Sequence, residues 1–271
     1  MARALAGTLQ DLFETTVTVD NRVGGSGAVA TAYLVTRAAP DGSVLQLVTP
    51  TQLITPLRAG GIPSFEDVTP VARLLLDPTI LYVRRDSPFR TAEEMFQSAM
   101  ESPGSLTWGV GSAGSLDQLL IDEIRTSTGI DVRMVPHEGG GDAMLSVLGG
   151  HIDAGLGEPG QFLAQLETGA IRVLTIFEED RSPRFPEVPT FRELGYPVES
   201  LKFRGVWGPP GMPEELSQII GKTLRDAMEE EPFRSYYRAG SMRPAYLGTR
   251  EFTEFLVGAR ERVEQTMGQT P

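Results

Sequence analysis

The sequence lacks cysteine and has only two histidines, His137 and His151, which lie far apart in the chain. Without cysteine there are no disulfides, thiolate catalysts or cysteine-ligated metals, and an exported and a cytosolic protein remain equally compatible. HExxH and His-x-His spacings are also missing, so we expect no metal site, and we expect no cofactor. No apolar run reaches 18 residues and no signal peptide is visible, so we expect no membrane span.

Basic residues are the minority among the charged ones, with 24 Lys and Arg against 36 Asp and Glu and a net charge of -12. A nucleic-acid partner is not expected, because a phosphate backbone requires a basic surface. The 271 residues suffice for one large or two medium domains. The hydrophobic share of 40% is ordinary for a soluble globular protein.

A glycine-rich turn at residues 109–115 is the most informative stretch. It follows a predicted strand at 106–110 and opens a predicted helix that runs to about Ser127. Ser115 fits the N-cap of this helix, and Gln118 completes a capping box. The free amides of such a turn, with the helix dipole behind them, suit a carboxylate or a phosphate. A plain strand-to-helix turn, with glycines for steric room, is the alternative.

Strands, glycine turns and helices alternate along the chain, which predicts an α/β protein with largely parallel sheets. Predicted helices cover residues 1–14, 28–37, 92–102, 116–127, 143–148, 160–167, 214–228, 232–238 and 250–267. Predicted strands cover residues 16–20, 44–49, 71–76, 80–83, 106–110, 132–136, 152–156, 171–177 and 201–207, and residues 51–68 are expected to be irregular. Two more glycine-rich turns, at 21–27 and 138–142, open helices. Ligands bind at the carboxyl ends of parallel strands, so we expect two lobes facing one another across a cleft.

An ordered set of motifs spans nearly the whole chain. Its members are Asp20–Gly27, Ala39–Gly42, Asp67–Val71, Gly109–Ser115, Val135–Asp153, Arg181–Thr190, Arg204–Val206 and Pro209–Gly211. In this order they resemble the Bug/TctC family, the substrate-binding proteins of tripartite tricarboxylate transporters. No single motif is specific, but the ordered set is.

The resemblance implies a two-lobed type II periplasmic-binding-protein fold that traps its ligand by hinge closure. Lobe 1 would comprise residues 1–84 and 205–271, and lobe 2 residues 85–204. The resemblance further implies a monomeric, non-enzymatic periplasmic protein that captures a small organic acid for the membrane subunits of a transporter. The expected ligand contacts are Thr49, Thr51, Gly111, Ser112, Ala113, Gly114, Ser115, Glu138, Gly139, Glu158 and Arg204.

Some of these residues have alternative roles. Arg204 either forms a bidentate pair with a ligand carboxylate or a salt bridge within the protein. Thr49 and Thr51 either contact ligand or cap a turn. Asp117, Glu138 and Asp142 either stabilise helix N-termini, by about 0.3–1 kcal/mol each, or face the cleft. If they face the cleft, they repel a second carboxylate and favour a monocarboxylate or a ligand that also carries a cation.

The start of the chain departs from the family pattern. Family members begin with an export signal, a first strand of lobe 1 and a P-x-G-G-x-x-D loop that clamps a carboxylate. Met1–Ala4 matches the segment that comes directly after that loop in the family. The pattern therefore leaves open a chain start downstream of the family's start and a truncated, non-binding remnant. Two further possibilities are a ligand-binding protein that feeds a sensor or regulator and an enzyme on the same fold, although no GxSxG-like elbow is present.

Overall fold

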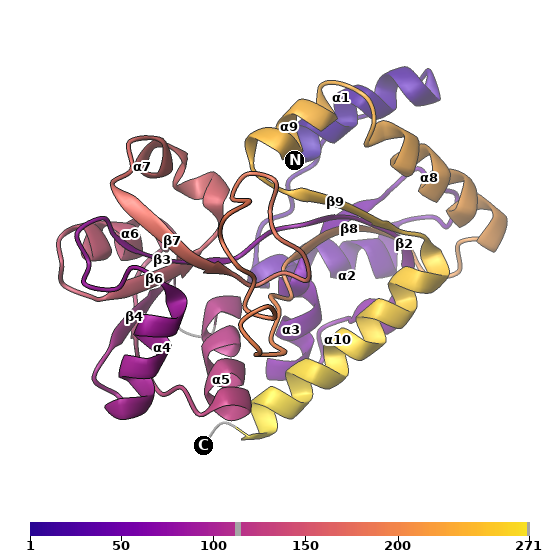
Figure 1. Cartoon of the computed structure of the whole chain (residues 1–271). Coiled ribbons are helices and arrows are strands. Elements are labelled where there is room, and N and C mark those ends of the chain that lie inside the picture. The colour runs from indigo at the N-terminus through magenta and orange to yellow at the C-terminus, as the bar shows by residue number, and fades with distance from the viewer. Residues whose placement is uncertain (112–114, 270–271) are drawn as a thin grey trace. The chain divides into compact units, whose positions relative to one another are not determined.

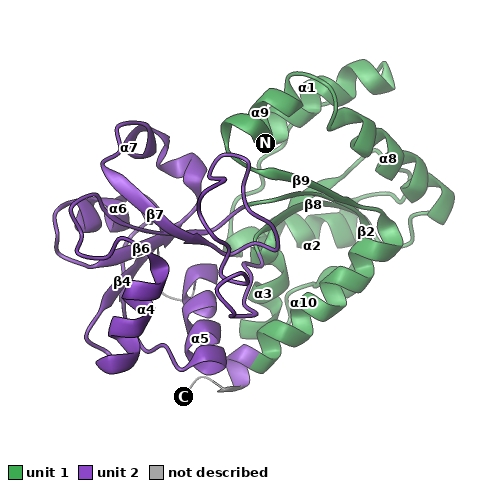
Figure 2. Ribbon diagram, viewed as in Figure 1, with its two compact units in different colours: residues 1–77, 202–265 green, residues 78–201, 266–271 purple. Residues whose placement is uncertain are grey.

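A computed structural model describes residues 1–111 and 115–269, which form two compact units (Figure 2). Unit 1 comprises residues 1–77 and 202–265, and unit 2 comprises residues 78–201 and 266–271. The chain thus passes between the units at 77/78, 201/202 and 265/266, and the first two crossings lie a few residues before the borders expected from the resemblance. None of the helices in the described ranges is long and apolar enough to cross a bilayer.

Unit 1 is built on a four-stranded sheet with helices packed on it (Figure 1). The strand order is β1 (Gln46–Val48), β8 (Phe203–Gly208), β2 (Thr69–Leu76) and β9 (Arg243–Leu247). The helices are α1 (Ala2–Phe13), α2 (Ala28–Arg37), α3 (Pro50–Arg58), α8 (Glu214–Ala227), α9 (Phe233–Ala239) and most of α10 (Thr249–Gln269), whose last turn belongs to unit 2, with short 3-10 turns at Gly25–Gly27 and Phe65–Asp67. Helix α8 covers β2, and α1 packs on α8 and α9, because Leu5 and Leu9 join the buried cluster of Leu74 and Leu224.

Unit 2 is built on a five-stranded sheet in the order β5-β4-β6-β3-β7. The strands are β3 (Ile80–Arg84), β4 (Thr107–Val110), β5 (Arg133–Pro136), β6 (Ala154–Gly157) and β7 (Ile171–Ile176). The helices are α4 (Ala92–Glu101), α5 (Leu116–Thr128), α6 (Gly140–Leu148) and α7 (Leu163–Glu167), with a 3-10 turn at Pro159–Gln161. Two buried clusters belong to this unit, one around Phe96, Trp108 and Phe191 and the other around Tyr82 and Phe162.

The prediction of largely parallel sheets is wrong. Strand β8 is antiparallel to both β1 and β2, and β9 is antiparallel to β2. In unit 2, β4 is parallel to β5 and β6, but β3 is antiparallel to β6 and β7. Strand β8 is antiparallel to its neighbours because of the route of the chain. The chain leaves unit 1 after β2 and returns through β8 in the opposite direction, so β8 lies between β1 and β2, which both run the other way.

Two local predictions also differ from the structure, and one strand has no counterpart among the predicted elements. Residues 16–20 alternate like a strand but lie outside both sheets, since alternation without a partner strand does not make a sheet. Residues 51–58, expected to be irregular, belong to helix α3 (Pro50–Arg58), because Thr49 and Gln52 build a capping box and Pro50 occupies the first turn. Strand β9 was not predicted at all.

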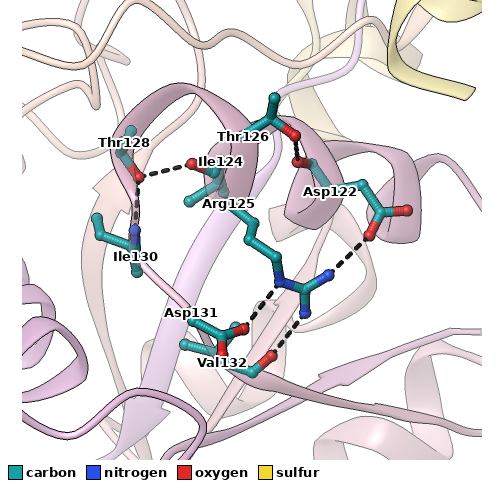
Figure 3. A network of polar contacts seen from close by, with 8 residues as sticks. All are labelled: Asp122, Ile124, Arg125, Thr126, Thr128, Ile130, Asp131 and Val132. Atoms are coloured by element: carbon teal, nitrogen blue, oxygen red, sulfur yellow. Dashed lines mark hydrogen bonds and ion pairs between the residues drawn. The ribbon is translucent and has the colours of Figure 1, made fainter. Parts of the chain in front are cut away.

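A network around Arg125 joins the end of α5 to the start of β5 (Figure 3). The Arg125 guanidinium donates to Asp131 Oδ1 at 2.8 Å, to Asp122 Oδ1 at 3.2 Å and to the Val132 carbonyl at 2.9 Å. Asp122 is 8% exposed, and its burial raises the pKa of its carboxyl group. The network therefore holds the α5–β5 connection through one of its side chains, Asp131, and through one of its backbone carbonyls, that of Val132.

Arg125→Met should lower the free energy of unfolding by about 2 kcal/mol, because it removes three hydrogen bonds and leaves Asp122 without its cation. Denaturant titration followed by circular dichroism measures the change. Arg133→Met is the matched control on the neighbouring strand, since Arg133 is exposed. Equal stability of the two variants would contradict a structural role for the network.

Candidate functional site

The candidate site of unit 2 lies where the turn after β4 meets the start of α6. A Cβ atom placed on Gly111 would lie 3.3 Å from the backbone nitrogen of Gly140, the first residue of α6. Strands β4 and β5 are parallel neighbours, so the segments after them emerge at the same edge of the sheet. Ser115 caps α5 by accepting a hydrogen bond from the Gln118 amide at 3.3 Å, as its sequence position predicts. Two helix N-termini therefore start from one edge, with backbone amides as donors.

The segment after β6 reaches the same place. Gln161 donates a hydrogen bond to the Glu158 carboxylate, and a Cβ atom on Gly140 would clash with Gln161 Oε1. Gly139 also lies beside Gly111, with its carbonyl carbon 3.7 Å from the position of that added Cβ atom. Of the predicted contacts, Gly111, Gly139 and Glu158 are thus brought together. Glu138 is an exposed residue between β5 and α6.

The charge of this site comes from acids and dipoles. Residues 106–121 and 134–161, which build it, contain no Lys or Arg. Asp117 is 8% exposed in the first turn of α5, whereas Asp142 is exposed in the first turn of α6. These two segments can therefore offer an anion backbone amides and hydroxyl groups, but no Lys or Arg side chain.

In unit 1, Thr49 and Thr51 lie at the N-terminus of α3. The Thr49 hydroxyl accepts from the Thr51 amide at 3.3 Å, and the Thr49 amide donates to Gln52 Oε1 at 2.8 Å. The Gln52 side chain also donates to the Ser26 carbonyl at 3.4 Å, so the glycine-rich turn before α2 packs on this helix start. The capping alternative is realised for Thr49, whose hydroxyl caps the helix, whereas Thr51 supplies the capped amide. A direct contact with ligand stays a prediction.

Arg204 forms an ion pair within unit 1. Its Nε donates to Asp77 Oδ2 at 2.6 Å, and its Nη2 contacts the same oxygen. The Asp77 side chain is 6% exposed and the Arg204 side chain 33%. The salt-bridge alternative therefore describes Arg204, and its contact with ligand stays a prediction.

Three predicted contacts, Ser112, Ala113 and Gly114, lie outside the described residues. Within the described ranges no group of three or more His, Asp or Glu side chains is arranged to hold a metal ion.

Two residues near the site were not predicted from the sequence, Gln161 and Tyr82. The Tyr82 hydroxyl is fully buried and has no hydrogen-bond partner among the residues that the structure describes. The only signal for Tyr82 was a polar atom inside the apolar run Ile80–Val83.

Comparison with known proteins gives consistent matches. A family profile described as "Tripartite tricarboxylate transporter family receptor" (TctC) matches residues 1–269. Protein BugT of Bordetella pertussis is 30% identical over 253 residues, which cover 90% of this chain and 76% of BugT. A protein of Cupriavidus necator is 28% identical over 254 residues, covering 93% of this chain and 77% of that protein.

Solved structures share the fold. A TctC solute-binding protein from Polaromonas superposes with a TM-score of 0.86 at 26% identity, covering 99% of this chain and 92% of that chain. An R. palustris protein with adipate gives a TM-score of 0.78 at 24% identity, covering 98% and 91% of the two chains. The fold is the two-lobed type II fold of periplasmic binding proteins. The chain therefore belongs to the TctC family of tripartite tricarboxylate transporter receptors, which are substrate-binding proteins and not enzymes.

Proposed function

We propose that this protein binds a small organic carboxylate in the periplasm and delivers it to the membrane subunits of a tripartite tricarboxylate transporter. The observation that carries the proposal is the approach of Gly111, the residue directly after β4, to the first residue of α6, whose first amides have no partner within the helix. Amides at helix N-termini bind carboxylates without a basic side chain. Related proteins have been crystallised with adipate and with malate, which supports an acid as ligand.

The acidic side chains around the site restrict which organic acids can bind there. Asp117 and Asp142 lie in the first turns of the two helices, and Glu158 comes directly after β6. One carboxylate at the amides gains from the helix dipoles, but further carboxylates of the same ligand meet like charges. We therefore propose that the amides of unit 2 hold one carboxylate and that a tricarboxylate is a poor ligand.

A calorimetric titration tests this function directly. At fixed ionic strength we expect saturable binding of at least one acid among propionate, lactate, succinate, malate and adipate. Citrate should bind at least about 10-fold more weakly than the best of them, a difference of about 1.4 kcal/mol. If no acid gives a binding heat or shifts the thermal unfolding temperature, carboxylate binding is contradicted. Tight binding of citrate would contradict a site that holds only one carboxylate.

The transport role needs a cellular measurement. Cells that lack this protein should lose uptake of the labelled acid identified by calorimetry, and a plasmid copy should restore it. Normal uptake in its absence would argue against delivery to a transporter, although it would leave ligand binding intact.

A further inference from the structure

Tyr82 of β3 carries a buried hydroxyl that no described group satisfies. The residue is 0% exposed, and the hydroxyl oxygen has no hydrogen-bond partner among the residues that the structure describes. Its ring packs against Phe162 with 4.9 Å between the ring centroids. A phenylalanine would fill the same space without burying an unpaired hydroxyl, so the oxygen costs stability unless something binds it.

The hydroxyl extends across the sheet toward the candidate site. Tyr82 pairs with Gly155 of the neighbouring strand β6, and Gly155 pairs with Gly109 of β4. A Cβ atom on Gly155 would clash with the Tyr82 hydroxyl, so the side chain lies over that glycine. Only a glycine at this position leaves room for the tyrosine to reach over β6.

The ring that packs on Tyr82 also touches the candidate site. Phe162 lies 4.9 Å from Tyr82 between ring centroids, and the tip of the Phe162 ring would lie 3.8 Å from a Cβ atom placed on Gly140. Tyr82 is thus one side chain away from the start of α6. Burial raises the pKa of Tyr82, so its hydroxyl stays protonated, as a hydrogen-bond donor, at neutral pH.

We propose that the Tyr82 hydroxyl determines specificity by donating a hydrogen bond to a hydroxyl group of the bound acid. This inference rests on the proposed function and names a feature of its ligand. A second ligand carboxylate at this place would meet the like charge of Glu158, which is hydrogen-bonded to Gln161 beside the start of α6, whereas a hydroxyl is uncharged. A ligand hydroxyl can accept from Tyr82 and donate to a carboxylate of the protein, so both partners are satisfied.

The test compares acids that differ by one hydroxyl, malate with succinate and lactate with propionate, by calorimetry. The wild-type protein should prefer the hydroxy acid at least 10-fold in one pair. Tyr82→Phe should weaken binding of that hydroxy acid at least 10-fold and of its partner less than 2-fold. Tyr237→Phe is the matched control, because its buried hydroxyl donates to the Met228 carbonyl at 3.1 Å in unit 1. This control should leave the preference unchanged.

Thermal unfolding without ligand gives a second, independent readout. Tyr82→Phe should unfold at the wild-type temperature or above it, whereas Tyr237→Phe should unfold below it, because it loses a hydrogen bond. A Tyr82→Phe variant that unfolds several degrees lower would show that the hydroxyl is bound inside the folded protein, and this would overturn the inference. Wild-type and Tyr82→Phe proteins with the same preference would overturn it too, yet leave carboxylate binding standing. If the wild-type protein binds no acid, both the proposed function and this inference are wrong.

Discussion

Gly111→Val is expected to weaken binding of the acid by about 100-fold, equivalent to about 2.7 kcal/mol. The new Cβ atom would lie 3.3 Å from the Gly140 nitrogen, and the valine methyl groups would cover the amides at the start of α6. A ligand carboxylate would then lose donors in a place that offers it no basic side chain. Calorimetry with the best acid of the panel measures the loss, and circular dichroism verifies that the fold is kept.

Gly141→Ala is the control for this variant. Gly141 lies in the same first turn of α6, but nothing lies within 4 Å of a Cβ atom placed on it. Its substitution should change affinity less than about 2-fold and should slightly favour the helix. If Gly111→Val binds the acid with wild-type affinity, the alternative interpretation of residues 109–115, a plain strand-to-helix turn without a role in binding, is the correct one.

Arg204→Met is expected to lower the free energy of unfolding by about 3 kcal/mol. The substitution removes the cation beside the Asp77 carboxylate, which is 6% exposed and cannot regain water without a structural change. Because Arg204 lies on the central strand β8 and Asp77 is the residue directly after β2, the disturbance reaches the middle of the unit 1 sheet.

Two comparisons make the Arg204 result specific. Asp77→Asn combined with Arg204→Met should recover part of the lost stability, since the buried charge is removed with its partner. Arg250→Met removes two ion pairs of a side chain that is 81% exposed, and it should cost less than about 0.5 kcal/mol. If Arg204→Met unfolds like the wild type but loses affinity for the acid, Arg204 contacts ligand and the ion pair with Asp77 is not its main role.

Local signals predicted much of the fold because they act over a few residues. The capping box of Thr91 and Glu94 and the N-cap at Ser115 appear in the structure at their predicted positions. The T-P-T-Q sequence at residues 49–52 carried the same signal for α3, but its proline and two threonines indicated a loop. The helix starts of the candidate site were thus accessible from sequence.

Partners that are distant along the chain could not be predicted in this way. The Asp77–Arg204 pair joins residues 127 positions apart, and the sequence alone left a ligand pair and a protein pair equally open for Arg204. Tyr82 resembles any core aromatic residue until its neighbour Gly155 is known. The direction of β8 depends on the return of the chain into unit 1, which no local pattern records.

The place of β8 between β1 and β2 has a consequence for biosynthesis. Once residues 1–77 have left the ribosome, two strands of the unit 1 sheet are outside it, but the strand that lies between them is not. Most of unit 2 is synthesised next as one uninterrupted segment, so we expect it to fold first, although it comes second in the chain. Until β8 emerges, the edges of β1 and β2 remain unpaired, and nascent chains stalled in this interval are the ones most in need of a chaperone.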